Sequence, residues 1–167
     1  MSAISVAVLE SPFGTLTLAA SEAGLVRLAL PTEPTEEVIG ELHARYGEVH
    51  EDAAALDATR RTLDAYLAGR SRSLDVPVDW RIANGFTLAS LQRMAEIPYG
   101  ATVTYRELAA RAGNERASRA AGAACATNPV AIVLPCHRVL RSDGGLGGYG
   151  GGLAMKDALL RLEGVLL

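Results

Sequence analysis

The sequence predicts an α+β fold, with an N-terminal α/β half of short strands and helices followed by a mainly helical half. Alternation of apolar and polar residues is found mainly before Pro31, whereas helical spacing dominates after Gly85. Charge divides the chain at the same place, because residues 1–85 carry 7 Arg and 13 Asp or Glu, and residues 86–167 carry 9 Arg or Lys and 6 Asp or Glu. The first half therefore has a net charge of −6 and the second half a net charge of +3, which together give the −3 of the chain. We expect an anionic partner to bind the second half. We place the domain boundary after Ile82, which gives domains of residues 1–82 and 83–167.

Three strands and two helices are predicted in the first half. The strands are separated by turn sequences that contain Gly14 and Gly24, as expected of an antiparallel meander. They span residues 4–9, 15–18 and 25–30. Helical spacing predicts one helix that follows Pro34 and runs to Tyr46, and a second over residues 53–67. Residues 74–78 alternate as well, but Pro77 restricts them to an edge strand or an extended linker.

The second half is predicted to contain a helix over residues 86–95, a helix-turn-helix, and a closing helix over residues 155–162. Thr104 and Glu107 have the spacing of a capping box, so the first helix of the helix-turn-helix begins there and runs to about Ala112. Asn114 can cap the second helix, which is predicted over residues 115–126. The apolar residues 131–134 are interpreted as a buried extended segment.

Cys136 is the strongest candidate for a reactive residue. It precedes His137 and Arg138, and positive charge lowers the pKa of a thiol toward the nucleophilic thiolate. Pro135 suits the first turn of a short helix, which would place Cys136 near the positive end of its dipole. The tetrapeptide alone is equally compatible with a buried structural cysteine. Cys125, on an alanine-rich helix, is interpreted as a core residue.

His137 and Glu163 are the candidates for activating this thiol. Adjacent residues do not face each other on a helix, so a bridging water is a better route from Cys136 to His137 than a direct hydrogen bond. An acid should orient the imidazole. Glu163 stands near an apolar face of the last helix and could supply that acid, or it could be a solvated residue at a helix end.

Composition excludes several classes of protein. No apolar run is long enough to cross a membrane, and the start of the chain lacks a secretory signal, which indicates a cytoplasmic protein. The 2 cysteines and 3 histidines form no Cys-x-x-Cys or His-x-x-x-His pair, so we expect neither a disulfide framework nor a zinc site. The glycine-rich residues 143–152 lack the signature of a P-loop, and they either admit a flat ligand or form a mobile turn.

Arg119 is the candidate for contacting DNA. It lies in the second helix of the predicted helix-turn-helix among small residues that include Ala120 and Gly122. A helix so poor in bulky side chains can approach another surface closely, and its one long cation could act on DNA. The helix could equally pack against another helix of the protein, with Arg119 at the rim.

Together these residues resemble the O6-alkylguanine-DNA alkyltransferase family. The central match is Pro135-Cys136-His137-Arg138-Val139. The other matches cover nearly the whole chain: Ser11-Pro12-Phe13-Gly14-Thr15-Leu16, Ile97-Pro98-Tyr99-Gly100, Thr104-Tyr105, Arg119-Ala120, Asn128-Pro129, Gly148-Tyr149, Gly151-Gly152, and Leu159-Leu160 with Glu163. A tetrapeptide alone is a weak signal, whereas this ordered set is highly specific.

The resemblance implies an RNase H-like N-terminal α/β domain joined to a helical domain that binds DNA and carries the active site. It implies a methylated-DNA–protein-cysteine methyltransferase that moves an alkyl group from O6-alkylguanine, and also from O4-alkylthymine, in double-stranded DNA onto Cys136. The nucleotide has to be flipped out, because the O6 alkyl group is unreachable inside the duplex. The thioether product is stable, so each molecule reacts once. We expect no cofactor, no metal and no membrane partner, and a monomer that acts from the minor groove.

The resemblance also implies roles for individual residues. His137 would act on the thiol through water, Glu163 would orient His137, and Asn128 would brace the active-site turn. Tyr105 would help to rotate the nucleotide out of the duplex and would donate a proton as guanine leaves. Arg119 would occupy the place that the flipped nucleotide leaves in the base stack. Further DNA contacts would come from Thr104, Ala120 and Gly122. The substrate pocket would be lined by Arg138, Val139, Tyr149, Gly150 and Gly151.

Four positions depart from the family pattern. Thr87 and Gln92 would concern packing, whereas Ala131 and Gly150 could change the size of the alkyl group that the pocket admits. Three other functions compete with repair: a non-catalytic lesion sensor, a thiol hydrolase with many turnovers, and a plain helix-turn-helix regulator. The presence of Cys136 disfavours the sensor, and a regulator would leave the Pro-Cys-His-Arg turn without a purpose.

Overall fold

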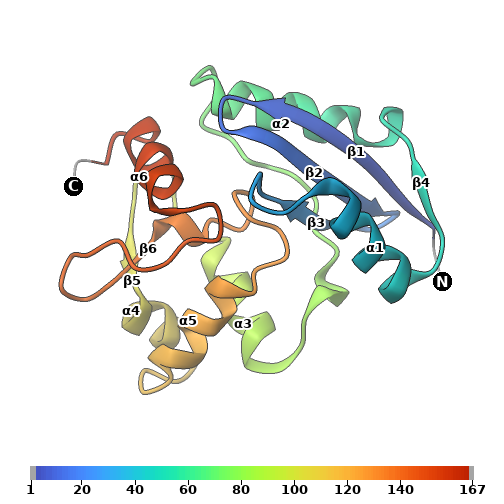
Figure 1. Ribbon diagram of the computed structural model, residues 1–167. Helices are drawn as coiled ribbons and strands as arrows, with labels where there is room; N and C mark the ends of the chain where they lie inside the picture. The colour runs from blue at the N-terminus through green and yellow to red at the C-terminus, as the bar shows by residue number, and fades with distance from the viewer. Residues whose placement is uncertain (1–2, 166–167) are drawn as a thin grey trace. The chain divides into compact units, whose positions relative to one another are not determined.

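The computed structural model describes residues 3–165, and the chain divides into two compact units, Met1–Asp79 and Trp80–Leu167 (Figure 1). We call them the N-terminal unit and the C-terminal unit. The division falls a little before the boundary expected after Ile82. The reason is the 3₁₀ turn η2 (Trp80–Ile82), which leads directly into the first helix of the C-terminal unit.

The N-terminal unit is built on a four-stranded sheet with the order β3-β2-β1-β4 (Figure 1). The strands β1 (Ile4–Ser11), β2 (Gly14–Ser21) and β3 (Gly24–Ala29) form the predicted antiparallel meander. The short strand β4 (Val49–Glu51) pairs parallel to the start of β1. It was not predicted, because three residues with two exposed side chains carry no apolar alternation.

The helices of this unit agree with the predicted pattern except at one start. Helix α1 (Thr35–Tyr46) lies where it was expected. The second predicted helix is divided into the 3₁₀ turn η1 (Ala54–Leu56) and the helix α2 (Asp57–Leu67), both of which contact β1. Strands and helices share one apolar core, whose largest fully buried members include Leu16, Leu18, Leu28, Leu56, Leu63 and Tyr66.

The segment with Pro77 is an extended linker and not a strand. One isolated bridge joins Val78 to Leu25 of β3, and the backbone of Leu25 donates to the carbonyl of Pro77 at 2.8 Å. Proline has no N–H, so the ladder cannot continue. At this contact a Cβ on Gly24 would lie 2.6 Å from the carbonyl carbon of Pro77, and the φ of Gly24 is +141°. The close approach therefore requires glycine.

As far as residue 165, the C-terminal unit contains four α-helices and one short parallel strand pair. Helix α3 (Gly85–Met94) contacts both helices of the helix-turn-helix, α4 (Tyr105–Arg111) and α5 (Ser118–Ala126), and α6 (Leu153–Leu162) closes the unit. The hydroxyl of Thr104 accepts from the Glu107 N–H at 3.0 Å, so α4 has its predicted cap. Strands β5 (Val103–Thr104) and β6 (Val139–Leu140) are paired in parallel. This pairing brings the start of α4 next to the residues that follow Cys136.

Two local predictions in this unit are wrong. Helix α5 begins at Ser118 and not at Glu115, because the Asn114 carboxamide accepts from the Arg116 N–H at 3.0 Å and holds a turn there. Residues 131–134 are buried as expected but form a tight turn, in which the Leu134 N–H donates to the Val130 carbonyl at 2.9 Å. Ile132 has a φ of 72°, which is rare for a β-branched residue.

Across residues 3–165, no helix combines the length and the apolar character needed to cross a membrane.

Candidate active site

Cys136 lies at the start of the three-residue 3₁₀ turn η3 (Cys136–Arg138), between the buried turn at residues 131–134 and strand β6. Its residue surface is 6% exposed, so the sulfur is enclosed by protein and not presented on a surface loop. The Cys136 N–H donates to the Leu134 carbonyl at 2.8 Å. Every residue from Ala131 to Leu140 is buried, which fixes the backbone on both sides of the thiol.

The expected lowering of the thiol pKa is wrong in direction. Burial raises the pKa of Cys136, and a hydrogen bond from Asn128 together with the charge of Lys156 offsets this rise only in part. The turn η3 is too short to supply a substantial dipole, and the side chains of His137 and Arg138 both bind Glu163 and not the thiol. The thiol therefore keeps its proton at rest and needs a base when it reacts.

That base can be His137, whose imidazole is held by Glu163. The Nε2–H of His137 donates to Oε2 of Glu163 at 2.8 Å, and both side chains are fully buried. An ionised carboxylate only accepts hydrogen bonds, so the proton of a neutral His137 resides on Nε2, and Nδ1 is the basic nitrogen. Burial lowers the pKa of His137 against the opposing effect of Glu163, which keeps the ring neutral at rest.

Glu163 is a buried anion and not a solvated residue at a helix end. Arg138 donates to it twice, from Nε to Oε1 at 2.8 Å and from Nη2 to Oε2 at 2.9 Å, and the Gly100 N–H donates to Oε1 at 3.0 Å. Burial alone would raise the pKa of Glu163, but the hydrogen bonds from His137 and Arg138 outweigh it and hold the pKa well below its usual range. Glu163 can therefore both orient and polarise His137.

Arg138 makes contacts within the site that were not predicted. Its guanidinium is paired with Glu163, donates from Nη1 to the Ile97 carbonyl at 2.6 Å, and lies 5.9 Å from the centre of the Tyr99 ring. These contacts use the guanidinium to neutralise the buried carboxylate, and they explain why Glu163 can remain ionised. That Arg138 also lines the substrate pocket stays a prediction.

Lys156 belongs to the site and was not predicted. It is the only lysine of the chain and is fully buried, and its ammonium donates to the carbonyls of Val139 at 2.8 Å, Gly148 at 3.3 Å, and Leu146. Burial lowers its pKa, whereas the nearby thiols raise it. The sequence did contain a signal that Lys156 faces the core. Lys156 lies three and four residues before Leu159 and Leu160 on α6, which places it on the same helix face as these buried leucines.

Tyr105 lies at the first turn of α4 and faces the glycine-rich loop, which we define as residues 143–152. Its ring lies 5.8 Å from the ammonium of Lys156. A Cβ on Gly147 would be 2.5 Å from the Tyr105 hydroxyl, so the loop backbone touches the phenol. Burial, followed by electrostatic interaction with Cys125 and Cys136, raises the pKa of Tyr105 to about 12. The phenol therefore remains a proton-bearing donor across the physiological range.

Asn128 is hydrogen-bonded to the turn that precedes the thiol. Its Nδ2 donates to the Leu134 carbonyl at 2.8 Å, and its Oδ1 accepts from the Val130 N–H at 3.0 Å. The same side chain lowers the pKa of the Cys136 thiol against the effect of burial. One amide thus ties both ends of the turn together.

The remaining predicted residues differ in exposure. Arg119 and Ala120 are exposed on α5, and within residues 3–165 the Arg119 side chain has no hydrogen-bond or ion-pair partner. Gly122 faces Tyr105, because a Cβ there would lie 3.8 Å from the ring. Thr104 caps α4, Val139 is buried, Tyr149 and Gly151 are half-buried, and Gly150 is exposed.

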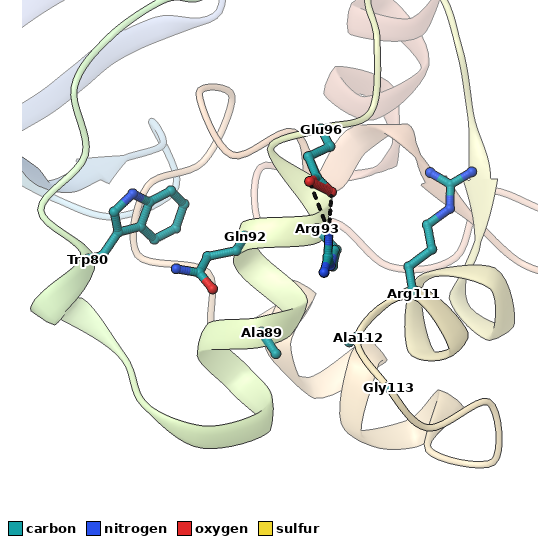
Figure 2. Close-up of a pocket in the computed structure, with 8 residues that line it drawn as sticks. All are labelled: Trp80, Ala89, Gln92, Arg93, Glu96, Arg111, Ala112 and Gly113. Atoms are coloured by element: carbon teal, nitrogen blue, oxygen red, sulfur yellow. Dashed lines mark hydrogen bonds and ion pairs between the residues drawn. The ribbon is translucent and has the colours of Figure 1, made fainter.

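A separate hollow of about 470 Å³ in the C-terminal unit is shown in Figure 2. It is lined by Trp80, Ala89, Gln92, Arg93, Glu96, Arg111, Ala112 and Gly113. Arg93 and Glu96 are paired at 3.0 Å within it, and no predicted site residue lines it. Among the described residues, no group of three or more His, Cys, Asp or Glu is arranged to hold a metal ion.

Two family models match the chain. The ribonuclease-like domain of 6-O-methylguanine DNA methyltransferase matches residues 4–80, and the DNA-binding domain of the same family matches residues 85–165. The methylated-DNA–protein-cysteine methyltransferase of Methanosarcina acetivorans is 39% identical over 158 residues, covering 95% of this chain and 97% of the relative. The enzyme of the same name from Mus musculus is 39% identical over 171 residues, covering 95% and 80%.

Solved structures agree with these matches. The O6-methylguanine methyltransferase of Mycobacterium tuberculosis superposes with a TM-score of 0.79 at 37% identity, covering 96% of this chain and 92% of that one. A structure of the OGT protein of Mycobacterium tuberculosis in complex with DNA gives 0.78 at 35% identity, covering 95% and 92%. The predicted fold, a ribonuclease-like α/β domain followed by a helical DNA-binding domain, is thereby confirmed. The chain belongs to the 6-O-methylguanine DNA methyltransferase family.

Proposed function

We propose that this chain repairs O6-methylguanine in DNA by transferring the methyl group to the sulfur of Cys136, once per molecule. The observation that carries the proposal is a buried thiol directly followed by a histidine whose Nε2–H is held by the buried carboxylate of Glu163 at 2.8 Å. The family membership supplies the reaction class, and the geometry supplies a nucleophile, a base and an orienting acid.

The proposed transfer is a displacement at the methyl carbon. The bond from Sγ to the methyl carbon forms as the bond from that carbon to O6 breaks, and guanine leaves with the electron pair. The thiol proton passes through a water molecule to Nδ1 of His137, whose Nε2–H remains bound to Glu163. Tyr105 donates its Oη–H to a ring nitrogen of the departing guanine, and the proton on His137 returns to Tyr105 through solvent. The net change exchanges the thiol proton for the methyl group, and no step regenerates the thiol.

The proposed DNA contact uses the helix-turn-helix formed by α4 and α5. The exposed face of α5 carries Arg119 next to Ala120, so a small-residue surface with one long cation is available to the minor groove. Because the reacting sulfur is buried, the base has to leave the duplex to reach it. Arg119 would occupy the gap in the base stack, and a single protein molecule suffices for this arrangement.

The same site could take O4-alkylthymine, as the resemblance implies. Thymine also presents its alkylated oxygen next to a ring nitrogen, so the attack at the alkyl carbon would be the same. Ala131 and Gly150 remain the proposed determinants of the alkyl group that fits. We expect methyl transfer from thymine to depend on Cys136 as transfer from guanine does.

Intact mass spectrometry with peptide mapping tests the proposal. The protein is mixed with excess duplex that contains one O6-methylguanine, and we expect a single gain of one CH₂ mass on the peptide with Cys136, with no further consumption of lesion. Cys136→Ser should abolish the gain and retain binding, whereas Cys125→Ser, at the other cysteine, should leave it intact. Tight lesion binding with unchanged mass would indicate a sensor, and continuing turnover of a small ester would indicate a hydrolase.

A further inference from the structure

Arg141 follows β6 directly and begins a tight turn that leads into the glycine-rich loop. Its N–H donates to the Gly145 carbonyl at 2.9 Å, and its carbonyl accepts from the Gly144 N–H at 3.0 Å. The carboxylate of Asp143 accepts from the Gly145 N–H at 2.9 Å. The backbone of Arg141 is therefore held in place by bonds that do not involve its side chain.

The Arg141 side chain reaches back over this turn. Its Nη2 donates to Oδ2 of Asp143 at 2.8 Å, and a Cβ on Gly145 would lie 3.5 Å from Cδ of Arg141. The two paired side chains are 61% and 60% exposed. An ion pair this exposed contributes little to stability, so an incoming anion can replace Asp143 without a large penalty.

The turn lies beside the proposed base pocket. Two residues past Gly145, the backbone of Gly147 touches the Tyr105 hydroxyl, and Lys156 holds the carbonyls on both sides of Gly147. Although burial is the main influence on Tyr105, the charge of Arg141 also acts on its phenol and lowers the pKa against that burial. The guanidinium is thus an exposed cation on the Tyr105 side of the pocket.

We propose that Arg141 binds a DNA backbone phosphate next to the flipped nucleotide, exchanging Asp143 for the phosphate when DNA arrives. This inference rests on the proposed function. A guanidinium presents parallel N–H donors that fit two oxygens of a phosphodiester as well as they fit a carboxylate. Asp143 orients the side chain before DNA binds, and the phosphate then holds the sugar of the flipped nucleotide while its base enters the pocket.

The test compares three proteins on one duplex that contains a single O6-methylguanine. Equilibrium binding is measured in the Cys136→Ser background, so that transfer does not consume the lesion. We expect Arg141→Gln to weaken binding by about tenfold at low salt and to reduce the slope of log affinity against log salt by about one phosphate contact, a change of about 0.9. Arg70→Gln is the matched control, because Arg70 pairs with Asp64 at 3.0 Å with side chains 62% and 58% exposed. It should change neither quantity.

A second measurement separates phosphate binding from a structural role. With Cys136 restored, the rate of reaction with free O6-benzylguanine, which carries no phosphate, should stay within about twofold of the unsubstituted protein in Arg141→Gln, because the backbone bonds of the turn remain. Arg141→Lys should recover most of the salt slope but only part of the affinity, since an ammonium cannot bind two oxygens in parallel.

Two results would overturn the inference. One is an unchanged salt slope in Arg141→Gln. The other is an equal loss of rate with duplex and with free base, which would make Arg141 a brace of the loop. Failure of the proposed function can be distinguished from failure of this inference. In that case Cys136 of the unsubstituted protein would not be methylated, whatever the salt dependence of binding shows.

Discussion

The two units of the molecule differ in what they bury. Within the described residues, the N-terminal unit buries two polar side chains, and each meets a hydroxyl: Thr17 contacts Thr35 at 2.8 Å, and Asp79 accepts from Ser21 at 2.6 Å. The C-terminal unit buries more polar side chains, most of them ionisable: Ser90, His137, Arg138, Lys156 and Glu163. All of these except Ser90 gather around Cys136.

This difference indicates that the buried charged side chains of the C-terminal unit serve the reaction and not the stability of the fold. Removing charges from water is costly, and a buried ion pair is often no more stable than apolar residues of the same volume. The cluster of His137, Arg138 and Glu163 is therefore poorly explained as a device for stability. It is well explained as a means of orienting and polarising one imidazole, which burial keeps neutral, directly after a thiol that burial has made reluctant to ionise.

The largest predicted effect comes from neutralising that cluster. Glu163→Gln leaves the Arg138 guanidinium buried without a counter-charge, and we expect the free energy of unfolding to fall by about 3–5 kcal/mol. Methyl transfer should fall with it, because His137 loses its orienting acid. Urea unfolding of purified protein measures the first effect, and Cys136 methylation measures the second.

The matched change in the N-terminal unit is Asp64→Asn, which breaks an exposed ion pair with Arg70. Its effect on the free energy of unfolding should stay below about 1 kcal/mol, and transfer should be unchanged. If the two substitutions had similar effects, the contrast between the units would be incorrect.

The same contrast explains which features could be predicted from the sequence. The meander of β1, β2 and β3 follows from local alternation and from turns at Gly14 and Gly24, and these are short-range signals. The start of α5 was misplaced because the Asn114 side chain can serve either a cap or a turn, and only the structure shows which.

The features of the site also divide into those that the sequence predicts and those that it does not. Cys136, His137 and Glu163 were predicted as site residues from the order of motifs, whereas their geometry depends on contacts between segments far apart in the chain. The pKa of Cys136 was predicted in the wrong direction because its sequence neighbours are cationic, while burial depends on the whole unit. Lys156 was missed because a lysine between apolar helix positions is usually solvated.

Acid should destabilise the C-terminal unit through the same cluster. The folded pKa of Glu163 is depressed, so its contribution is fully present above the unfolded value of about 4.3 and is lost as pH falls below it. The folded pKa of His137 is also lowered, so its contribution is lost as pH falls below about 6.5. Each proton taken up changes the free energy of unfolding by up to about 1.4 kcal/mol per pH unit.

Unfolding free energies from pH 7 to pH 3, for the unsubstituted protein and for Glu163→Gln, measure this effect. The substituted protein should show a shallower loss below about pH 4.3, because the group responsible is gone. Parallel curves would assign the acid sensitivity to other carboxylates.

Gly147→Ala should disturb the site through sterics alone. The new Cβ would meet the Tyr105 hydroxyl at 2.5 Å, and the φ of +72° is unfavourable for alanine. We expect a loss of about 1–3 kcal/mol in unfolding free energy and slower methyl transfer. Gly152→Ala is the control, because it has a φ of +95° and nothing within 4 Å of the added atom. It should share the backbone strain and leave transfer nearly unchanged, so equal slowing in both would remove the role of the contact with Tyr105.

The smallest effect is predicted in the N-terminal unit and has the opposite sign. Gly40 is an exposed residue within α1, and a Cβ there would meet nothing within 4 Å. Gly40→Ala should raise the free energy of unfolding by about 0.5–1 kcal/mol, because alanine loses less backbone freedom than glycine on entering a helix. Methyl transfer should be unaffected, since no site residue lies in this unit. A gain in stability accompanied by slower transfer would show that the N-terminal unit takes part in the reaction, and that the division between the two units is less complete than their buried side chains indicate.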